Sequence, residues 1–235
     1  SGILIRAIGP HLKDKRREPA VVAVAEDGSS AVPLLGGHHG ANDLARRIAA
    51  VCKGHAAITT ASDLRLGVAL DEPASGYVLG NPEDMKSVTA AILAGATVRL
   101  EAAPGLSPLP GLDPAPADGA APFVTLKVTH ARTGGDGQTL VYHPKTLVLG
   151  IGCERGVPAK DVIAHVEAVL SSEGLAPQAL AAIASIDVKA DEAALHAVAR
   201  HFDVPARFFT AEELRAEAHR LKNPSALVEK EVGTP

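Results

Sequence analysis

The chain has 235 residues, the length of one large domain or two small ones. Its residues are 46% hydrophobic but only 3% aromatic with no Trp, so the core must be built from Ala, Val, Leu and Ile. The scarcity of aromatic rings argues against a stacking platform for single-stranded nucleic acid. The formal net charge of −4 argues against a global basic field for DNA or RNA, and no run approaches the ~18 apolar residues of a membrane span.

Apolar periodicity and turn signals predict the elements in chain order. The first part is expected to contain strands at 3–8, 21–25, 31–35 and 57–60, and helices at 41–52 and 81–93. The middle part is expected to contain a hairpin of strands 123–129 and 139–142, closed by a loop at 134–137. The last part is expected to contain strands at 146–151, 183–186 and 206–209, and helices at 158–170, 177–182, 191–201 and 210–219. Asp191 and Thr210 are the predicted caps of the last two helices, with Glu213 at capping-box spacing from Thr210.

Strands that alternate with helices predict an α/β fold, made of two small α/β domains with mostly parallel sheets. Pro, Gly, Ala and Asp dominate residues 104–122, a composition typical of a linker that buries little apolar area. The predicted divisions are therefore 1–103, a linker and hairpin at 104–145, and 146–235. The chain opens inside an apolar run and its single Met is Met85, so we expect both ends to interrupt a longer protein.

A Gly-rich turn joins the strand at 31–35 to the helix at 41–52, and it carries His38 and His39. Sites in open α/β sheets form where strands end in this way, and imidazole titrates near neutral pH. At least one of the two histidines is therefore a candidate for acid–base work, the alternative being that both are surface residues of the turn. The apolar face predicted for the helix consists of Ala41, Leu44, Ala45, Ile48 and Cys52.

A second Gly-rich turn, Gly150-x-Gly152-x-x-x-Gly156, misses the dinucleotide-binding spacing by one residue. It presents Cys153, Glu154 and Arg155 at a helix start, where exposed N–H groups favour anions. Cys153 is either a small structural residue or a nucleophile whose thiol pKa is lowered by the helix N-terminus. Cys52 and Cys153 stand alone and far apart, which suits a reduced cytoplasmic compartment, and no histidine or cysteine spacing typical of a metal site is found.

Residues 13–17 carry four positive charges and one negative charge. Such a run is either a solvated loop or a local receptor for carboxylates, which would be distinctive in a chain of negative net charge.

Several of these segments together resemble the cobalt-precorrin-5A hydrolase (CbiG) family of cobalamin biosynthesis. The segments are Gly2-Ile3-x-x-Arg6, Lys13-Asp14-Lys15, Pro19-Ala20-Val21-Val22, Gly36-Gly37-His38-x-Gly40-Ala41-Asn42, Ile58-Thr59-Thr60-Ala61-x-Asp63, Asn81-Pro82, Leu149-Gly150-Ile151-Gly152-Cys153-x-Arg155-Gly156, Ala184-Ser185-Ile186-Asp187-x-Lys189-x-Asp191-Glu192 and Phe208-Phe209. The family's turn usually reads Ser-Gly-His, and Gly36 stands in place of that Ser. The last part also resembles CobE, and similar segments are fused to a precorrin methyltransferase in some bacteria.

The resemblance implies a reaction in which the δ-lactone on ring A of cobalt-precorrin-5A is opened and acetaldehyde is released, giving cobalt-precorrin-5B. His38 or His39 would transfer protons, and Asn42 with the backbone of Gly36 and Gly37 would stabilise an oxyanion. Carboxylate arms of the substrate would be held by Arg6, Lys13 and Lys15. The remaining substrate-binding candidates, taken from the resembling motifs, are Thr59, Thr60, Asp63, Cys153, Glu154 and Arg155.

The implied partner is an anionic cobalt-corrinoid, joined by other enzymes of the corrin pathway, with no nucleic acid and no membrane. No cofactor or protein metal site is expected, because the cobalt arrives with the substrate. The alternative function is a non-catalytic carrier that escorts corrinoid intermediates, and release of acetaldehyde distinguishes the two. A nucleotide-binding regulator would need phosphate ligands that the sequence does not show.

Overall fold

The computed structural model describes residues 2–12, 19–37, 40–58, 70–71, 73–110, 112, 123–221, 224, 229–230 and 233. The chain divides into two compact units, the first made of 1–75, 81–127 and 135–141 and the second of 76–80, 128–134 and 142–235. Helices and sheets with both parallel and antiparallel pairs make up the described residues, so the predicted α/β class is confirmed.

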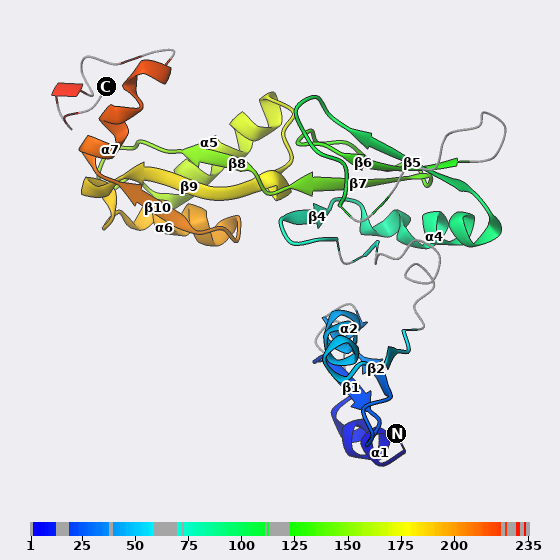
Figure 1. The fold of residues 1–235 in the computed structure, drawn as a ribbon. Coiled ribbons are helices and arrows are strands. Elements are labelled where there is room, and N and C mark those ends of the chain that lie inside the picture. Colours follow the sequence, from blue (N-terminus) through cyan, green and yellow to red (C-terminus); the bar gives the residue numbers. More distant parts are fainter. Residues whose placement is uncertain are drawn as a thin grey trace. The chain divides into compact units, whose positions relative to one another are not determined.

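The first unit begins with a three-stranded sheet in the order β1-β2-β3, with α2 packed against all three strands (Figure 1). Strand β2 pairs antiparallel with β1 and parallel with β3. The elements are α1 (Gly2–Ile8), η1 (Gly9–His11), β1 (Val21–Val24), β2 (Ser30–Leu35), α2 (Ala41–Cys52) and β3 (His55–Ala56). The strand predicted at 3–8 is wrong, because this segment is helix α1. The short strand predicted at 57–60 lies earlier, at β3, and residues 59 and 60 are outside the described residues.

Helix α2 has the predicted bounds, and its buried face shares Ala41 and Ala45 with the predicted one but is shifted toward Asn42 and Ala49. Its buried residues are Ala41, Asn42, Ala45 and Ala49, whereas Leu44 and Cys52 are exposed. Because the buried side chains are mostly small, the helix can lie close to the sheet. The polar side chain of Asn42 lies on the same face of the helix and is buried with them.

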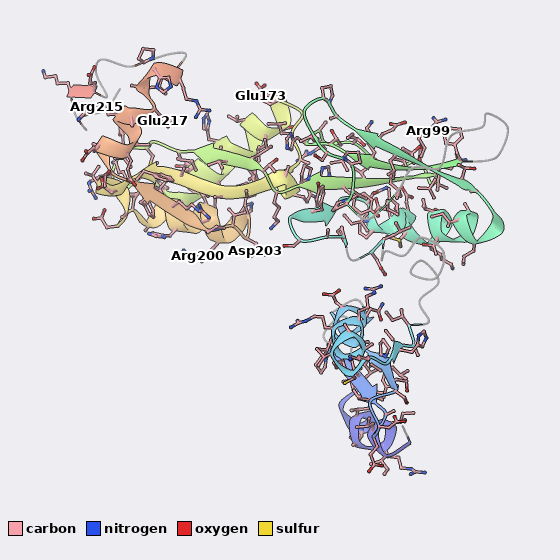
Figure 2. All side chains as sticks on the ribbon, in the orientation of Figure 1. Arg99, Glu173, Arg200, Asp203, Arg215 and Glu217 are labelled. Atoms are coloured by element: carbon pink, nitrogen blue, oxygen red, sulfur yellow. The ribbon has the colours of Figure 1, made fainter. Side chains whose placement is uncertain are left out.

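The first unit continues with η3 (Pro82–Asp84), α4 (Met85–Ala94), β5 (Thr97–Ala102) and β6 (Phe123–Val128). The predicted helix at 81–93 is therefore present, with one 3-10 turn at its start, while β5 and β4 (Tyr77–Leu79) were not predicted. Arg99 of β5, labelled in Figure 2, has its guanidinium carbon 3.8 Å from the centre of the Phe123 ring at the start of β6. The described linker residues, 104–110 and 112, contain no helix or strand.

Asn81 links the start of this helical segment to β7 (Thr139–Pro144). Its side chain is 2% exposed. The amide Nδ2 donates to Thr139 O at 2.7 Å and to Asp84 Oδ2 at 2.9 Å, and the N–H of Val141 donates to Asn81 Oδ1 at 2.7 Å. One buried amide therefore satisfies two backbone groups of a strand about 60 residues away in sequence, with separations of 58 and 60 residues.

Strands β6 and β7 are neighbours in a sheet of order β4-β7-β6-β5, but they do not form the predicted hairpin. Thr125 N donates to Gln138 O and Thr129 N donates to Tyr142 O, so both donors precede their acceptors by the same offset. A constant offset is the pattern of parallel strands, whereas a hairpin requires antiparallel ones. The segment between them leaves the sheet, with Ala131 bridged to Leu175, and returns to begin β7 in the same direction.

The second unit carries a three-stranded sheet in the order β10-β9-β8, parallel throughout (Figure 1). Its elements are β8 (Leu147–Gly150), α5 (Ala159–Ser172), η4 (Pro177–Ala179), β9 (Leu180–Ile186), η5 (Asp187–Lys189), α6 (Ala193–His201), β10 (Ala206–Phe209), α7 (Ala211–Ala216) and η6 (Ala218–Arg220). The register sets Leu149, Ile183 and Ala206 side by side, and all three pack into one core with α5 and α6. The predicted parallel βαβ arrangement is therefore present here.

Local sequence signals account for some element ends in the second unit and miss others. Thr210 and Glu213 form the predicted capping box at the start of α7, although that helix ends at Ala216 and is followed by a separate 3-10 turn. The helix predicted at 177–182 is wrong, because only η4 is helical and β9 already begins at Leu180. Helix α6 begins at Ala193 after Glu192, so the predicted cap Asp191 lies outside it.

His143 gives the second unit an expected pH dependence. The side chain is buried, with Nδ1 at 2.8 Å from Thr129 O, and burial lowers its pKa despite that hydrogen bond, helped by the nearby His130. Since the unfolded chain binds this proton at higher pH than the folded one, its effect is absent above pH ~6.5, and stability falls as pH drops below that value. Urea titrations at pH ~7.5 and ~5.5 measure the change in the free energy of unfolding. His143→Asn, which keeps a donor but does not titrate, should lose less stability between the two, and an equal loss would contradict the assignment.

Candidate functional site

The turn before α2 requires glycine at two places. Gly36 has φ +66°, and a Cβ there would lie 2.8 Å from Pro19 O and 3.0 Å from Ala20 N. Gly40 has φ +87° and occupies the N-cap position of α2, while the N–H of Ala41 donates to Gly36 O at 3.0 Å. Because any side chain at Gly36 would be both strained and crowded, the family's usual Ser could not be accommodated in this conformation.

Asn42 lies against this turn. Its side chain is 3% exposed, and a Cβ built on Gly37 would meet Asn42 Oδ1 at 3.5 Å. The structure therefore brings Gly36, Gly37 and Asn42 together at the N-terminus of a twelve-residue helix, where the helix dipole favours negative charge. This geometry suits the predicted oxyanion role, which stays a prediction.

The other predicted residues of the N-terminal part fall into two groups. Arg6 is exposed on α1, whose main packing partner is η1, and its contact with the substrate stays a prediction. The residues that lie outside the described residues are His38, His39, Lys13, Lys15, Thr59, Thr60 and Asp63.

In the second unit, two loops at the carboxyl ends of β8 and β9 are joined by side chains. The Nη1 atom of Arg155 donates to both carboxylate oxygens of Asp191 at 2.9 and 3.1 Å, and Nη2 donates to Val188 O at 2.6 Å. The Gly156 N–H donates to Glu192 Oε2 at 3.2 Å. Arg155 holds the pKa of Asp191 below its ordinary value, chiefly through their hydrogen bond. These contacts position the loop that carries Cys153 and Glu154.

The thiol pKa of Cys153 is shifted in the direction opposite to the one a helix N-terminus would give. Burial and the neighbouring carboxylate of Glu192 raise its pKa, and Lys189 offsets this only partly. The lowered pKa expected for a nucleophile is therefore wrong, because a thiolate here would be both partly desolvated and next to a carboxylate. The predicted substrate contacts of Cys153, Glu154 and Arg155 stay predictions.

A pocket of about 480 Å³ opens beside this loop, between the end of β8 and one flank of α5. Its apolar wall is Leu149, Ile151, Val157, Val162, Val166 and Val169, and its polar lining is Cys153, Glu154, Asp161 and His165. Sequence reasoning missed Asp161 and His165. The signal that could have found them is their i, i+4 spacing on a helix that follows a Gly-rich turn at a strand end.

The described part of the chain has neither a metal-binding cluster nor a membrane-spanning helix. No group of three or more His, Cys, Asp or Glu side chains there could hold a metal ion. None of the helices described is long and apolar enough to cross a membrane.

Comparison with known proteins places the chain. Residues 1–63 match the family model "Cobalamin synthesis G N-terminal" and residues 147–235 match "Cobalamin synthesis G C-terminus". A cobalt-precorrin-5A hydrolase of Salmonella typhimurium is 32% identical over 249 residues, covering 99% of this chain and 70% of the relative. The chain belongs to the cobalt-precorrin-5A hydrolase (cobalamin synthesis G) family. The resemblance stated from the motifs is thus confirmed.

Two further relatives extend this family assignment. The cobalt-precorrin-5A hydrolase of Priestia megaterium is 29% identical over 252 residues, covering 99% of this chain and 67% of that protein. Protein CobE of a Sinorhizobium species is 54% identical over 82 residues, covering 35% of this chain and 53% of that protein. The predicted domain limits at residues 103 and 145 stay a prediction.

Proposed function

We propose that this chain is a cobalt-precorrin-5A hydrolase of cobalamin biosynthesis, which opens the ring A δ-lactone of its substrate and releases acetaldehyde. The observation that carries the proposal is the 32% identity to a named hydrolase over 99% of the chain. The Gly-rich turn before α2 supports it, since it sets a buried amide and a helix N-terminus side by side. Hydrolysis of the lactone needs a base that activates water, an acid for the leaving alkoxide, and donors for the developing oxyanion. Release of acetaldehyde then needs a base that removes the proton of the freed hydroxyl as the carbon–carbon bond to the macrocycle breaks, and an acid that protonates the macrocycle carbon that takes the electron pair.

Within this proposal His38 transfers protons with His39 as its partner, and the backbone of Gly36 and Gly37 with Asn42 stabilises the oxyanion. The cobalt belongs to the substrate, so the chain needs no metal of its own for these steps. A cytoplasmic location and contacts with other corrin-pathway enzymes stay predictions.

Incubating the purified chain with cobalt-precorrin-5A and following acetaldehyde by a coupled NADH assay tests the proposal. Acetaldehyde formed in proportion to enzyme supports the hydrolase. Tight binding of the corrinoid with no acetaldehyde would instead support the alternative function, a non-catalytic carrier.

The basic segment gives a salt-dependent prediction. The double substitution Lys13→Ala with Lys15→Ala is expected to weaken corrinoid binding, since each well-formed charge-assisted hydrogen bond contributes about 1.5–3 kcal/mol. Binding by the unsubstituted chain should also weaken as salt is added, because ions screen exposed charges. Isothermal titration at several salt concentrations measures both effects. Lys230→Ala is the control, because Lys230 lies outside the predicted carboxylate receptor. A corrinoid affinity that changes neither with salt nor with the double substitution would contradict this role.

A further inference from the structure

We propose that His165 donates an axial nitrogen ligand to the cobalt of a corrinoid bound in the pocket beside β8 and α5. This inference rests on the proposed function, because it takes the cobalt-corrinoid as the ligand, and it deepens that function by assigning a binding site in the second unit.

The pocket has one long apolar wall. Residues from Asp161 to Val169 line it along one flank of α5, a length of about 12 Å at 1.5 Å per residue. The opposite wall is the end of β8 with its following loop. Val162 and Val166 are buried behind the surface, so the floor is part of a packed core and presents a rigid apolar wall. A pocket of this size and character is typical of small-molecule sites.

His165 is the donor on this lining best suited to cobalt. It is exposed, and none of the described residues forms a hydrogen bond with its ring. Neutral imidazole is a good ligand for first-row transition metals at neutral pH. Cys153 lines the same pocket, but its raised pKa keeps it a thiol, which is the poor form for metal binding.

Asp161 provides the second element of a metal-binding arrangement. It lies four residues before His165 on α5 and lines the same pocket, so its carboxylate can accept the N–H of the ring nitrogen that does not bind cobalt. A carboxylate in this place fixes the ring and raises the basicity of the ligating nitrogen. Asp161 is a positioning residue in this scheme.

The charges in the pocket favour a metal carried by a macrocycle. Glu154 and Asp161 would repel a free carboxylate but attract the positive centre of a cobalt macrocycle. The described residues provide no cluster of three metal ligands, which a bare ion would require. A corrinoid supplies four nitrogens of its own, so one imidazole is enough.

Electron paramagnetic resonance of cobalt(II) tests this coordination directly. The probe is cob(II)inamide, a corrinoid with no nucleotide base of its own, added to the full chain. A single histidine nitrogen on the axis splits each cobalt line into a triplet, and protein labelled with ¹⁵N-histidine must turn that triplet into a doublet. His165→Ala should lose the splitting and weaken binding about 10–100-fold, and Asp161→Asn should weaken binding about tenfold while keeping the splitting. Added imidazole should restore the triplet in His165→Ala.

His219→Ala is the matched control, since His219 is also exposed in the second unit but does not line the pocket. It should keep both the splitting and the affinity. Binding without nitrogen splitting, or splitting that survives in His165→Ala, would overturn the coordination and leave the proposed hydrolase intact. No binding of cob(II)inamide at all, together with no acetaldehyde from cobalt-precorrin-5A, would overturn both. Acetaldehyde release that proceeds without binding of cob(II)inamide would overturn the coordination alone.

Discussion

His38→Ala is expected to lower the rate of acetaldehyde release by about 10²–10⁴-fold, the range of a lost general acid or base. His38 directly follows Gly37 and aligns with the single His of the family's turn motif. The side chain is expected to move a proton between the attacking water, or the leaving alkoxide, and solvent. Single-turnover assays with cobalt-precorrin-5A separate this chemical step from substrate binding.

Two neighbouring substitutions give this prediction its controls. His39→Ala should have a smaller effect, and His55→Ala, an exposed residue of β3 outside the turn, should have none. Thermal melts of all three variants check that the fold is retained. Normal turnover in His38→Ala would remove His38 from the mechanism. If substrate binding were also normal, the turn would be only a structural connection between β2 and α2.

Of the substitutions considered for stability, Asn81→Ala is expected to lower the free energy of unfolding the most. The substitution leaves Val141 N–H and Thr139 O without their partner, and each buried group left unsatisfied costs about 1–3 kcal/mol. The free energy of unfolding from urea titration measures the effect. Asp136→Ala is the comparison, because Asp136 is exposed and accepts from Gln138 N and from Thr139 Oγ1 at the start of β7, so water can replace its carboxylate and the loss should be smaller.

Two adjacent glycines test the same contact from the other side. A Cβ on Gly135 would overlap Asp84 Oδ2 and Asn81 Nδ2, and would lie 2.8 Å from Asp84 Cγ, whereas a Cβ on Gly134 meets nothing within 4 Å. Gly135→Ala should therefore destabilise the chain and Gly134→Ala should not. Equal stability of the two variants would contradict the role given to Asn81.

Prediction from sequence succeeded where the signal is local. Helix α2 was placed at its observed bounds because apolar periodicity and a Gly-rich start agree, and the capping box of Thr210 and Glu213 needs only four residues. The segment at 3–8 was misassigned because a short apolar run has no period that separates a helix from a strand. For α2, apolar periodicity predicts the helix but only part of its buried face, because small residues and Asn42 are buried there while Leu44 is exposed.

The failures share a dependence on distant partners. A Gly-rich segment between two strands is typical of a hairpin, but the contact between Ala131 and Leu175 turns it into a return path between parallel strands. The pairing of Arg155 with Asp191 spans 36 residues, so no local signal indicates that this cation already has a carboxylate partner. The pocket that contains His165 likewise depends on how α5 packs beside β8.

The excursion between β6 and β7 also determines how this protein can be cut for experiments. Arg132 N donates to Gly174 O and Ala176 N donates to His130 O, while His130 Nε2 lies 2.6 Å from Thr146 Oγ1. A piece that begins at residue 146 would lose all three partners at the corner between α5 and β9, including the one that satisfies the N–H of the buried Ala176. An excised C-terminal fragment should therefore begin before His130, so that these hydrogen-bond partners are kept.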